Sequence, residues 1–316
     1  MRASSQARES APKSGARARP ARVVLSAAVG AVGLARMARG DFAGFRRGPS
    51  PMPGGWKPIP PTMLKASDEQ TVAAVAAVLD AVAGLGPAAP SGGYPDWGIV
   101  AAPRFPGRAM VAVALDRFEA EGVWGVSPHL IPHFALHSEA GTLSLALGVH
   151  GPNLGVGGGA DSALQGALTA LTWLAEGRLP GVWLVLSGYT PEHAPPPKGS
   201  PPPEPGAGPE CQALALAVVP EGSAGGRGPR LRIVAEDGPA PEGPVDLRQV
   251  AGRLRPGAGV GAVVPTAIYR PHIRFPQEDA ATAWTIGADP TSGLRAELVG
   301  DAPVAAGAGA DEGGRR

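Results

Sequence analysis

The sequence has a single cysteine, Cys211, and almost no excess of charge of one sign. One cysteine excludes an internal disulfide and any metal site built from several cysteines, and it suits a reducing compartment such as the cytoplasm. The 28 lysines and arginines nearly balance the 27 aspartates and glutamates, so no global field attracts nucleic acid, a membrane surface or a polyanionic substrate. Function is therefore expected to come from a local site or an interface.

The apolar stretch at residues 23–35 is too short to span a bilayer. It is followed by "RMARG", where a secretory signal needs small residues for cleavage, so we expect no export and a first strand at 22–28. Residues 1–21 are rich in arginine and serine without an apolar period, which predicts a disordered basic arm. Residues 301–316 are of low complexity and are predicted to form a disordered tail.

Between these ends, helical and strand patterns alternate, which predicts an α/β fold in one domain over residues 22–237. A helix is predicted at about 67–84, where Ser67 and Gln70 form a capping-box pair before a helical apolar period. A second helix is predicted over 138–147, before Gly148. The remaining expectations are strands at 97–103, 211–219 and 230–237, an exposed proline-rich loop at 191–210, and an irregular C-terminal extension at 238–300.

The segment 151–192 is predicted to form a strand, a glycine turn, a helix and a second strand. The helix at about 161–176 is apolar on nearly all sides, which predicts that it is buried between layers. Its N-terminus would present free backbone N–H groups and the positive end of the helix dipole, where a nucleophile, an oxyanion or a phosphate is often bound. The turn residues that could hold an anion or an acyl group are Gly157, Gly158, Gly159, Asp161 and Ser162.

Several chemical interpretations of this turn compete. Gly155, Gly157 and Ala160 match a dinucleotide-binding fingerprint, but the next strand, "WLVLSGYT", does not end in the acidic residue that such a site needs. No Lys-Ser/Thr pair follows the glycines, which disfavours a phosphate-binding loop, and Ser162 lacks the flanking glycines of a nucleophile elbow. From chemistry alone, a turn in which glycine supplies only positive φ and tight packing is favoured.

Three histidines, His129, His133 and His137, have a spacing that could hold zinc on one helix face. Pro128 and Pro132 argue against a continuous helix there, so we expect no metal site. We also expect no cofactor. Cys211 begins a strand without a basic neighbour and is interpreted as a structural thiol.

The segment "SPHLIPHFALHSEAGTLSLALGVHGPNLGV", residues 127–156, resembles the β-ketoacyl synthase segment that leads into the nucleophile turn. The resemblance continues through "GVWLVLSG" and "ECQALALAVV", and it covers roughly residues 20–237. It implies the N-terminal half of a thiolase-like layered fold, with a mixed sheet, helices on both faces and a buried central helix at about 161–176.

The sequence departs from this family where the family carries out its chemistry. The family's nucleophilic cysteine falls on Ala160, whose methyl group cannot accept an acyl group. Asp161 and Ser162 do not replace it, because a carboxylate at a helix N-terminus is expected to act as a cap. The family's two later histidine motifs are not found: His272, in "IYRPHIRF", lacks their glycine-rich surroundings, and the residues after 237 are too few for the second half of the double fold.

The resemblance therefore implies a non-catalytic ketosynthase-like protein, acting as a partner or chain-length-factor-like subunit in fatty acid or polyketide-type acyl-chain biosynthesis. The family dimerises along the strand before the nucleophile, here Leu154, Gly155 and Val156, so the implied partner is an active ketosynthase or a second copy, with an acyl carrier protein as a further partner. Two alternatives stay open. One is an acyl-CoA- or dinucleotide-binding enzyme that uses the 155–160 turn, and the other is an inert structural remnant.

Overall fold

The computed structural model describes residues 22–48, 56–128, 130–192, 209–224, 229–235, 283–289 and 292–300. The predicted basic arm, the C-terminal tail at 301–316 and residues 193–208 of the predicted proline-rich loop lie outside these described residues.

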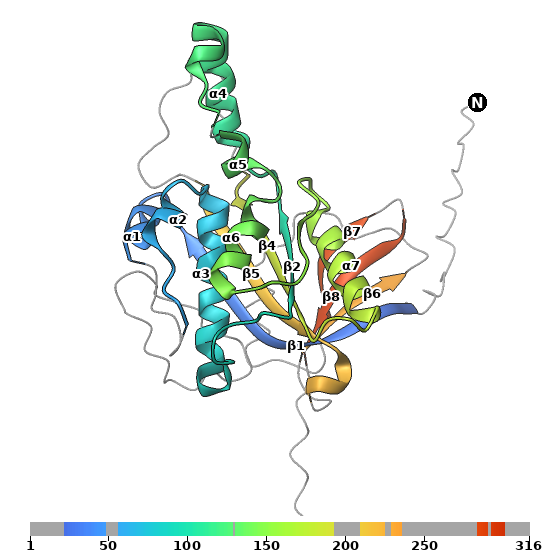
Figure 1. Cartoon of the computed structure of the whole chain (residues 1–316). Coiled ribbons are helices and arrows are strands. Elements are labelled where there is room, and N and C mark those ends of the chain that lie inside the picture. The colour runs from blue at the N-terminus through green and yellow to red at the C-terminus, as the bar shows by residue number, and fades with distance from the viewer. Residues whose placement is uncertain are drawn as a thin grey trace, which may run out of the picture.

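The described strands form one eight-stranded mixed sheet in the order β3-β2-β4-β5-β1-β6-β8-β7 (Figure 1). β2 pairs in parallel with β3 and β4, and the other neighbours pair antiparallel. The mixed α/β sheet predicted from the sequence is confirmed. The strands are β1 (Arg22–Met37), β2 (Gly98–Pro103), β3 (Asn153–Gly155), β4 (Val182–Thr190), β5 (Glu210–Val219), β6 (Arg230–Ala235), β7 (Ala283–Asp289) and β8 (Leu294–Val299).

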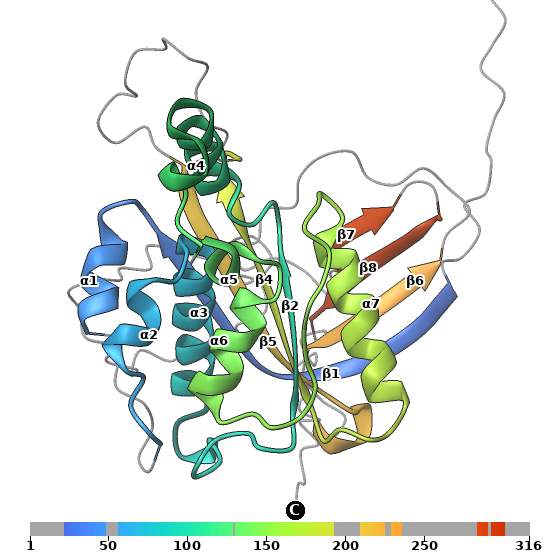
Figure 2. The same ribbon diagram turned by 45° about the horizontal axis from the view of Figure 1, so that its top comes forward.

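Helices cover both faces of the sheet, as predicted, and they enclose two separate cores. One core contains α1 (Asp41–Arg47), α2 (Pro61–Lys65), α3 (Glu69–Leu85) and α6 (Ser138–Leu147), and the other contains α7 (Ser162–Ala175), which Figure 2 shows apart from α3 and α6. The remaining helical segments are η1 (Gly86–Ala88), α4 (Arg108–Glu121), η2 (Gly122–Gly125), α5 (Leu130–Phe134) and η3 (Glu221–Ala224).

The alternation of small and large residues in β5 separates the two cores. Cys211 and the alanines that follow it at every second position face α3, whereas Leu214 and Leu216 face the α7 side. Small residues let α3 approach the sheet closely. At Gly33 in β1, an added Cβ would lie 1.9 Å from the carbonyl oxygen of Ala77 in α3. Backbone therefore contacts backbone where β1 crosses α3.

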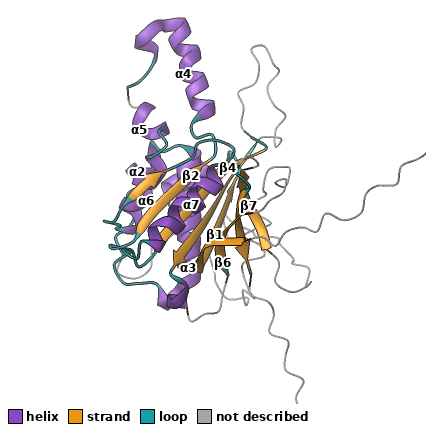
Figure 3. Ribbon diagram, turned by 90° about the vertical axis from the view of Figure 1, so that its right-hand side faces the viewer, coloured by secondary structure: helices purple, strands orange, loops and turns teal. Residues whose placement is uncertain are grey.

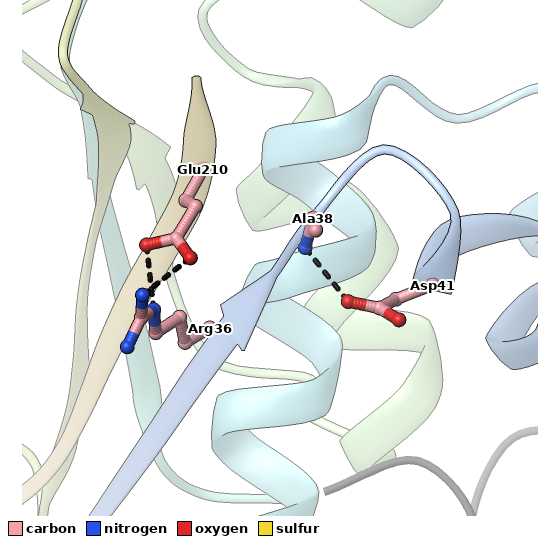
Figure 4. Close-up of polar contacts among 4 residues, drawn as sticks. All are labelled: Arg36, Ala38, Asp41 and Glu210. Atoms are coloured by element: carbon pink, nitrogen blue, oxygen red, sulfur yellow. Dashed lines mark hydrogen bonds and ion pairs between the residues drawn. The ribbon is translucent and has the colours of Figure 1, made fainter. Parts of the chain in front are cut away.

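β1 extends well beyond the predicted end at residue 28. Its first half, residues 22–28, pairs with β6, and its second half, residues 28–37, pairs with β5. At the far end, the Arg36 guanidinium donates to both carboxylate oxygens of Glu210 on β5, with 2.6 Å between Nε and Oε2 (Figure 4). The backbone N–H of Ala38 donates to Oδ2 of Asp41 at 2.7 Å, which turns the chain from β1 into α1 (Figure 4).

α3 is buried on most of its sides, and its predicted capping box is wrong. The N-cap is Asp68, whose carboxylate accepts from the backbone N–H of Thr71 at 2.8 Å. Ser67 instead donates to the carbonyl oxygen of Met63, and Gln70 donates to that of Arg104. By length and composition the segment Glu69–Ala88 could cross a membrane, but core helices have the same composition, and more than half of its most apolar window is buried in this fold.

The prediction that the helix at 161–176 is buried on all sides is also wrong. Leu164, Leu171 and Leu174 pack on the sheet, whereas Leu168 is 37% exposed on the outer face. Alanine and glycine make much of this helix apolar in composition without requiring burial. α7 is therefore an outer helix on one face of the described sheet.

The extension predicted to be irregular contains strands. β7 and β8 form a hairpin that continues the sheet beyond β6. At Gly287 in β7, an added Cβ would lie 2.6 Å from the backbone nitrogen of Leu164, so the hairpin packs closely against the start of α7. The β7–β8 hairpin, which is far from α7 in the sequence, thus covers part of the surface of this helix.

Candidate functional site

The carboxyl ends of β2, β3 and β4 meet at one edge of the sheet because these three strands are parallel. Ligands of open α/β sheets commonly bind outside such carboxyl ends. The segment after β2, the glycine turn after β3 and the end of β4 all leave the sheet at this edge. The turn identified in the sequence therefore lies where a site of this fold class is expected.

Hydrogen bonds and glycine geometry fix the shape of the turn. The backbone N–H of Val156 donates to the carbonyl oxygen of Ala101 at 2.8 Å, and that of Phe105 donates to Gly158 at 3.3 Å. Gly157 and Gly158 have φ values of 84° and 86°, which disfavour any residue with a Cβ. At Gly157 an added Cβ would also lie 2.6 Å from Cα and Cβ of Ser162. Glycine at this position thus lets the turn fold back on the start of α7.

The predicted anion or acyl site has no reactive side chain at its tip. Ala160 is exposed and presents a methyl group. Asp161 occupies the N-cap position, but its side chain makes no capping hydrogen bond and accepts from Nε2 of Gln165 instead. The predicted capping role of Asp161 is therefore wrong. Ser162 is 3% exposed and lies beneath Gly157, so its hydroxyl does not face outward from the turn.

The predicted dimer strand is β3 together with Val156. Among the described strands, β3 pairs with β2 alone, so its other edge is open. Leu154 is 42% exposed. At Gly155 an added Cβ would lie 2.0 Å from the carbonyl oxygen of Leu136, so the chain before α6 closely covers β3 at that point.

The histidine spacing does not produce a continuous helix face. His133 lies in α5, which ends at Phe134, and His137 is the N-cap residue of α6. Within the described ranges, no group of three or more histidine, cysteine, aspartate or glutamate side chains could hold a metal ion.

The structure gathers a buried polar cluster at the same edge, on the α3 and α6 side of the sheet, that the sequence does not predict. Oγ of Ser187 in β4 donates to Oε2 of Glu139 in α6 at 2.7 Å. The hydroxyl of Tyr189 donates to Oε2 of Glu69 in α3 at 2.8 Å. Neither Oε1 of Glu139 nor Oε1 of Gln70 has a hydrogen-bond partner among the described residues.

Burial changes the acidity of this cluster. Desolvation raises the pKa of Glu139 well above its usual value, and the charge of Asp68 adds to this shift while the Ser187 hydrogen bond opposes it. Desolvation likewise raises the pKa of Asp68. A carboxyl group in such surroundings is stabilised in its neutral form.

Cys211 lies in the same cluster, opposite Tyr189 in the β4–β5 register. It is fully buried, and desolvation together with the nearby carboxylates raises the pKa of its thiol well above the usual value. A thiol with a raised pKa is a weak nucleophile. The structure therefore agrees with its interpretation as a structural thiol.

The strand alternation of β4 is the one signal that could have located this cluster. Ser187 and Tyr189 share the strand face of Trp183 and Val185, which point toward α3 and α6. The carboxylate partners on two helices cannot be deduced from that alternation, because they depend on how the helices pack.

No protein-family model matches the chain, and no curated protein matches it. Solved structures do show similarity, over 60–74% of the chain in the following three. The ishigamide ketosynthase/chain length factor is 19% identical over 60% of this chain and 62% of its own, with a TM-score of 0.39. A type II polyketide synthase acyl-carrier protein in complex with its ketosynthase gives 17% identity, 63% and 64% coverage, and a TM-score of 0.43. A β-ketoacyl synthase from Burkholderia phymatum STM815 is 15% identical over 74% of this chain and 69% of its own, with a TM-score of 0.43.

The chain therefore spans less than two thirds of the length of the first two of these structures.

Proposed function

We propose that this chain is a non-catalytic β-ketoacyl synthase-like protein that serves as a partner or chain-length-factor-like subunit in fatty acid or polyketide-type acyl-chain biosynthesis. The observation that carries the proposal is Ala160. It is exposed on the glycine turn before α7, and the resemblance aligns it with the nucleophilic cysteine of the β-ketoacyl synthases. A methyl group cannot form a thioester, so the turn cannot take an acyl group from a carrier protein.

Neither Cys211 nor Ser162 supports catalysis at this turn as a substitute nucleophile. Cys211 is buried in the core on the α3 side of the sheet, whereas the turn leads into α7 on the opposite side. Ser162 is buried beneath Gly157. The buried, reduced thiol of Cys211 also suits a cytoplasmic location.

The open edge of β3 supports a role as a subunit. An unpaired strand edge can bind a strand of another protein through its backbone groups. Leu154 on this edge is 42% exposed, and a partner strand would cover it. The outer face of α7, with Leu168, offers further apolar surface to the same partner. The proposal is therefore compatible with an α7 whose outer face is exposed in the isolated chain.

Co-expression with a complete ketosynthase and an acyl carrier protein from the same organism tests this proposal. We expect a heterodimer with the ketosynthase to co-purify, and Leu154→Lys to weaken it at least tenfold. Val24→Lys, at a position of similar exposure in β1, is the matched control and leaves the complex intact. A chain that binds neither the ketosynthase nor the acyl carrier protein would contradict the proposal and favour an inert structural remnant.

A second experiment examines catalysis and ligand binding directly. The chain alone is expected to form no acyl-enzyme with acyl carrier protein thioesters, and Ala160→Cys is expected to add a thiol that reacts with iodoacetamide. Thermal-shift measurements with NAD, NADP and acyl-CoA should show no stabilisation. A rise of several degrees with one of them, lost in Gly158→Val, would instead support the ligand-binding enzyme.

A further inference from the structure

Among the described residues other than glycine, only Phe105 has a positive φ, at 49°. Phe105 lies between β2 and α4, and α4 begins three residues later at Arg108. Together with η2, this helix forms an arm that projects from the body of the molecule (Figures 1 and 3). Among the described elements, α4 packs substantially only against η2. The backbone at Phe105 therefore sets the direction of an arm that has little other packing.

The conformation of Phe105 is costly for two reasons. A residue as bulky as phenylalanine rarely adopts a positive φ, because its Cβ clashes with the backbone. Phe105 also precedes Pro106, and a residue before proline favours extended conformations. Gly107, with a φ of 63°, avoids this cost because it has no Cβ. The segment 104–107 thus stores backbone strain at Phe105, which an extended conformation there would relieve.

The peptide group that joins Arg104 to Phe105 is fixed to the body at both of its polar atoms. Its carbonyl oxygen, from Arg104, accepts from Nε2 of Gln70 in α3 at 2.8 Å. Its N–H, from Phe105, donates to the carbonyl oxygen of Gly158 at 3.3 Å. A change of φ at Phe105 leaves this planar group in place, because the rotation is about the bond from N to Cα. Such a change moves the chain that follows, beginning with Pro106 and α4.

Contacts on the arm side of Phe105 hold its positive φ. At Gly107 an added Cβ would lie 2.8 Å from Cβ of Phe134, so the backbone of Gly107 lies directly against α5. At Gly158 an added Cβ would lie 3.9 Å from Cδ of Pro106, so Pro106 lies beside the glycine turn. The two residues after Phe105 are therefore seated between the turn and α5.

The ring of Phe105 adds a further contact. Its centre lies 5.7 Å from Cζ of Arg104 and 5.3 Å from Cζ of Arg108. Guanidinium groups at these distances are attracted to an aromatic ring. Removal of the ring therefore weakens the observed conformation, whereas the backbone strain stays wherever the new residue has a Cβ.

We propose that Phe105 is a strained hinge with two states. In the held state, which the structure shows, φ is positive and the next two residues are seated between the glycine turn and α5. In the released state, Phe105 is extended, the seat is empty and α4 points in another direction. Because Gly158 of the turn contacts both the fixed peptide and Pro106, displacement of the turn favours release and redirects the arm. The inference does not rest on the proposed function, since it involves neither Ala160 nor the open edge of β3.

Urea unfolding of Phe105→Ala and Phe105→Gly tests the strain. Both variants lose the ring, so they differ only by a Cβ at this position. We expect the folding equilibrium constant to be about tenfold larger for the glycine variant, because glycine accepts a positive φ. Ala66→Gly, at an exposed residue with a φ of −96°, is the matched control and should lower the constant. If the alanine variant is as stable as the glycine variant, Phe105 is not strained and the proposal is overturned.

Double electron–electron resonance measures the direction of the arm. Nitroxide labels at Leu115→Cys in α4 and at Glu176→Cys just after α7 report the distance between arm and body. Both positions are exposed, and the native Cys211 is buried and stays unlabelled. We expect one distance with the native hinge and a second distance in Phe105→Ala, with a population at least fivefold smaller in Phe105→Gly. Equal distance distributions in these two variants would overturn the proposal.

The glycines at the two ends of α4 test the seat with the same labels. Gly107→Ala places a Cβ against Phe134 and should populate the second distance. Gly122→Ala is the matched control, because Gly122 has a similar φ of 68° but an added Cβ there meets no atom within 4 Å. It should keep the single distance. A second distance in both variants, or in neither, would contradict the seat.

Gly157→Ala tests the coupling between the turn and the arm. Its Cβ would lie 2.6 Å from Ser162, so it displaces the turn at a contact outside the hinge. We expect the second distance to appear in this variant and to be lost when Phe105→Gly is added, because the glycine hinge no longer gains from release. An arm distance that Gly157→Ala leaves unchanged would refute the coupling.

Discussion

Replacing Glu139 with glutamine is expected to stabilise the protein at neutral pH. The Glu139 side chain is almost completely buried at 3% exposure, and desolvation raises its pKa well above 4.5. Glutamine has the same shape, can keep the hydrogen bond from Ser187, and cannot ionise. It therefore removes the cost of keeping a carboxyl group protonated in the folded state.

The sign and size of the effect follow from proton linkage. Because the pKa of Glu139 is higher in the folded than in the unfolded state, its contribution to stability is fully present below pH 4.5. The contribution is lost as the pH rises from there toward the folded pKa. The slope cannot exceed about 1.4 kcal/mol per pH unit for one proton, so the upper limit between pH 5 and pH 7 is about 3 kcal/mol.

Urea unfolding of the full chain at pH 5, 6 and 7 measures this difference. The free energy of unfolding of Glu139→Gln minus that of the wild type should increase with pH. The same measurement on Glu176→Gln, at an exposed residue just after α7, serves as the control. If the Glu139→Gln difference does not change with pH, Glu139 is already ionised in the folded protein and the burial argument is refuted.

Three further predictions concern the backbone contacts and the thiol. Gly33→Ala should lower the free energy of unfolding by about 3 kcal/mol, because its Cβ would meet a carbonyl oxygen of α3 at 1.9 Å, whereas Gly30→Ala, with its nearest atom at 3.7 Å, should change it by less than about 0.5 kcal/mol. Equal effects in urea unfolding would contradict the close approach of β1 and α3. Cys211 should react with Ellman's reagent only as fast as the protein unfolds, and rapid labelling of the native protein would show that it is accessible. Gly157→Ala should lower the melting temperature more than Gly158→Ala, because both have positive φ but only Gly157 is crowded by the start of α7.

The sequence predicts the elements whose limits are set locally. α6 begins at Ser138 and ends at Leu147, as its apolar spacing and the following Gly148 indicate, and Gly148 adopts the left-handed conformation. β2 and β5 agree with their predicted ranges to within one residue. In each case, the element is determined by a contiguous pattern of apolar residues and by a nearby residue that ends it.

The features that the sequence does not predict depend on distant partners. The second half of β1 is a strand because β5 pairs with it, although its sequence is rich in alanine and glycine, which have low strand preference. The position of α7 on the outside of the sheet cannot be predicted from its composition, since alanine occurs at both buried and exposed positions. The buried cluster is missed because it joins residues of α3, α6 and β4 that are far apart in the chain.

At the carboxyl ends of the parallel strands β2, β3 and β4, the backbone leaves the sheet. Side-chain hydrogen bonds therefore hold the surrounding segments together there. Glu139 joins α6 to β4 through Ser187, Tyr189 joins β4 to α3 through Glu69, and Gln70 joins α3 to the segment after β2 by donating to Arg104 at 2.8 Å. That segment in turn donates from Phe105 to Gly158 of the glycine turn. The buried carboxyl of Glu139 costs stability at neutral pH, and its hydrogen bond fixes one of these links. The chain therefore retains a polar frame around the turn even though the tip of the turn carries only the methyl group of Ala160.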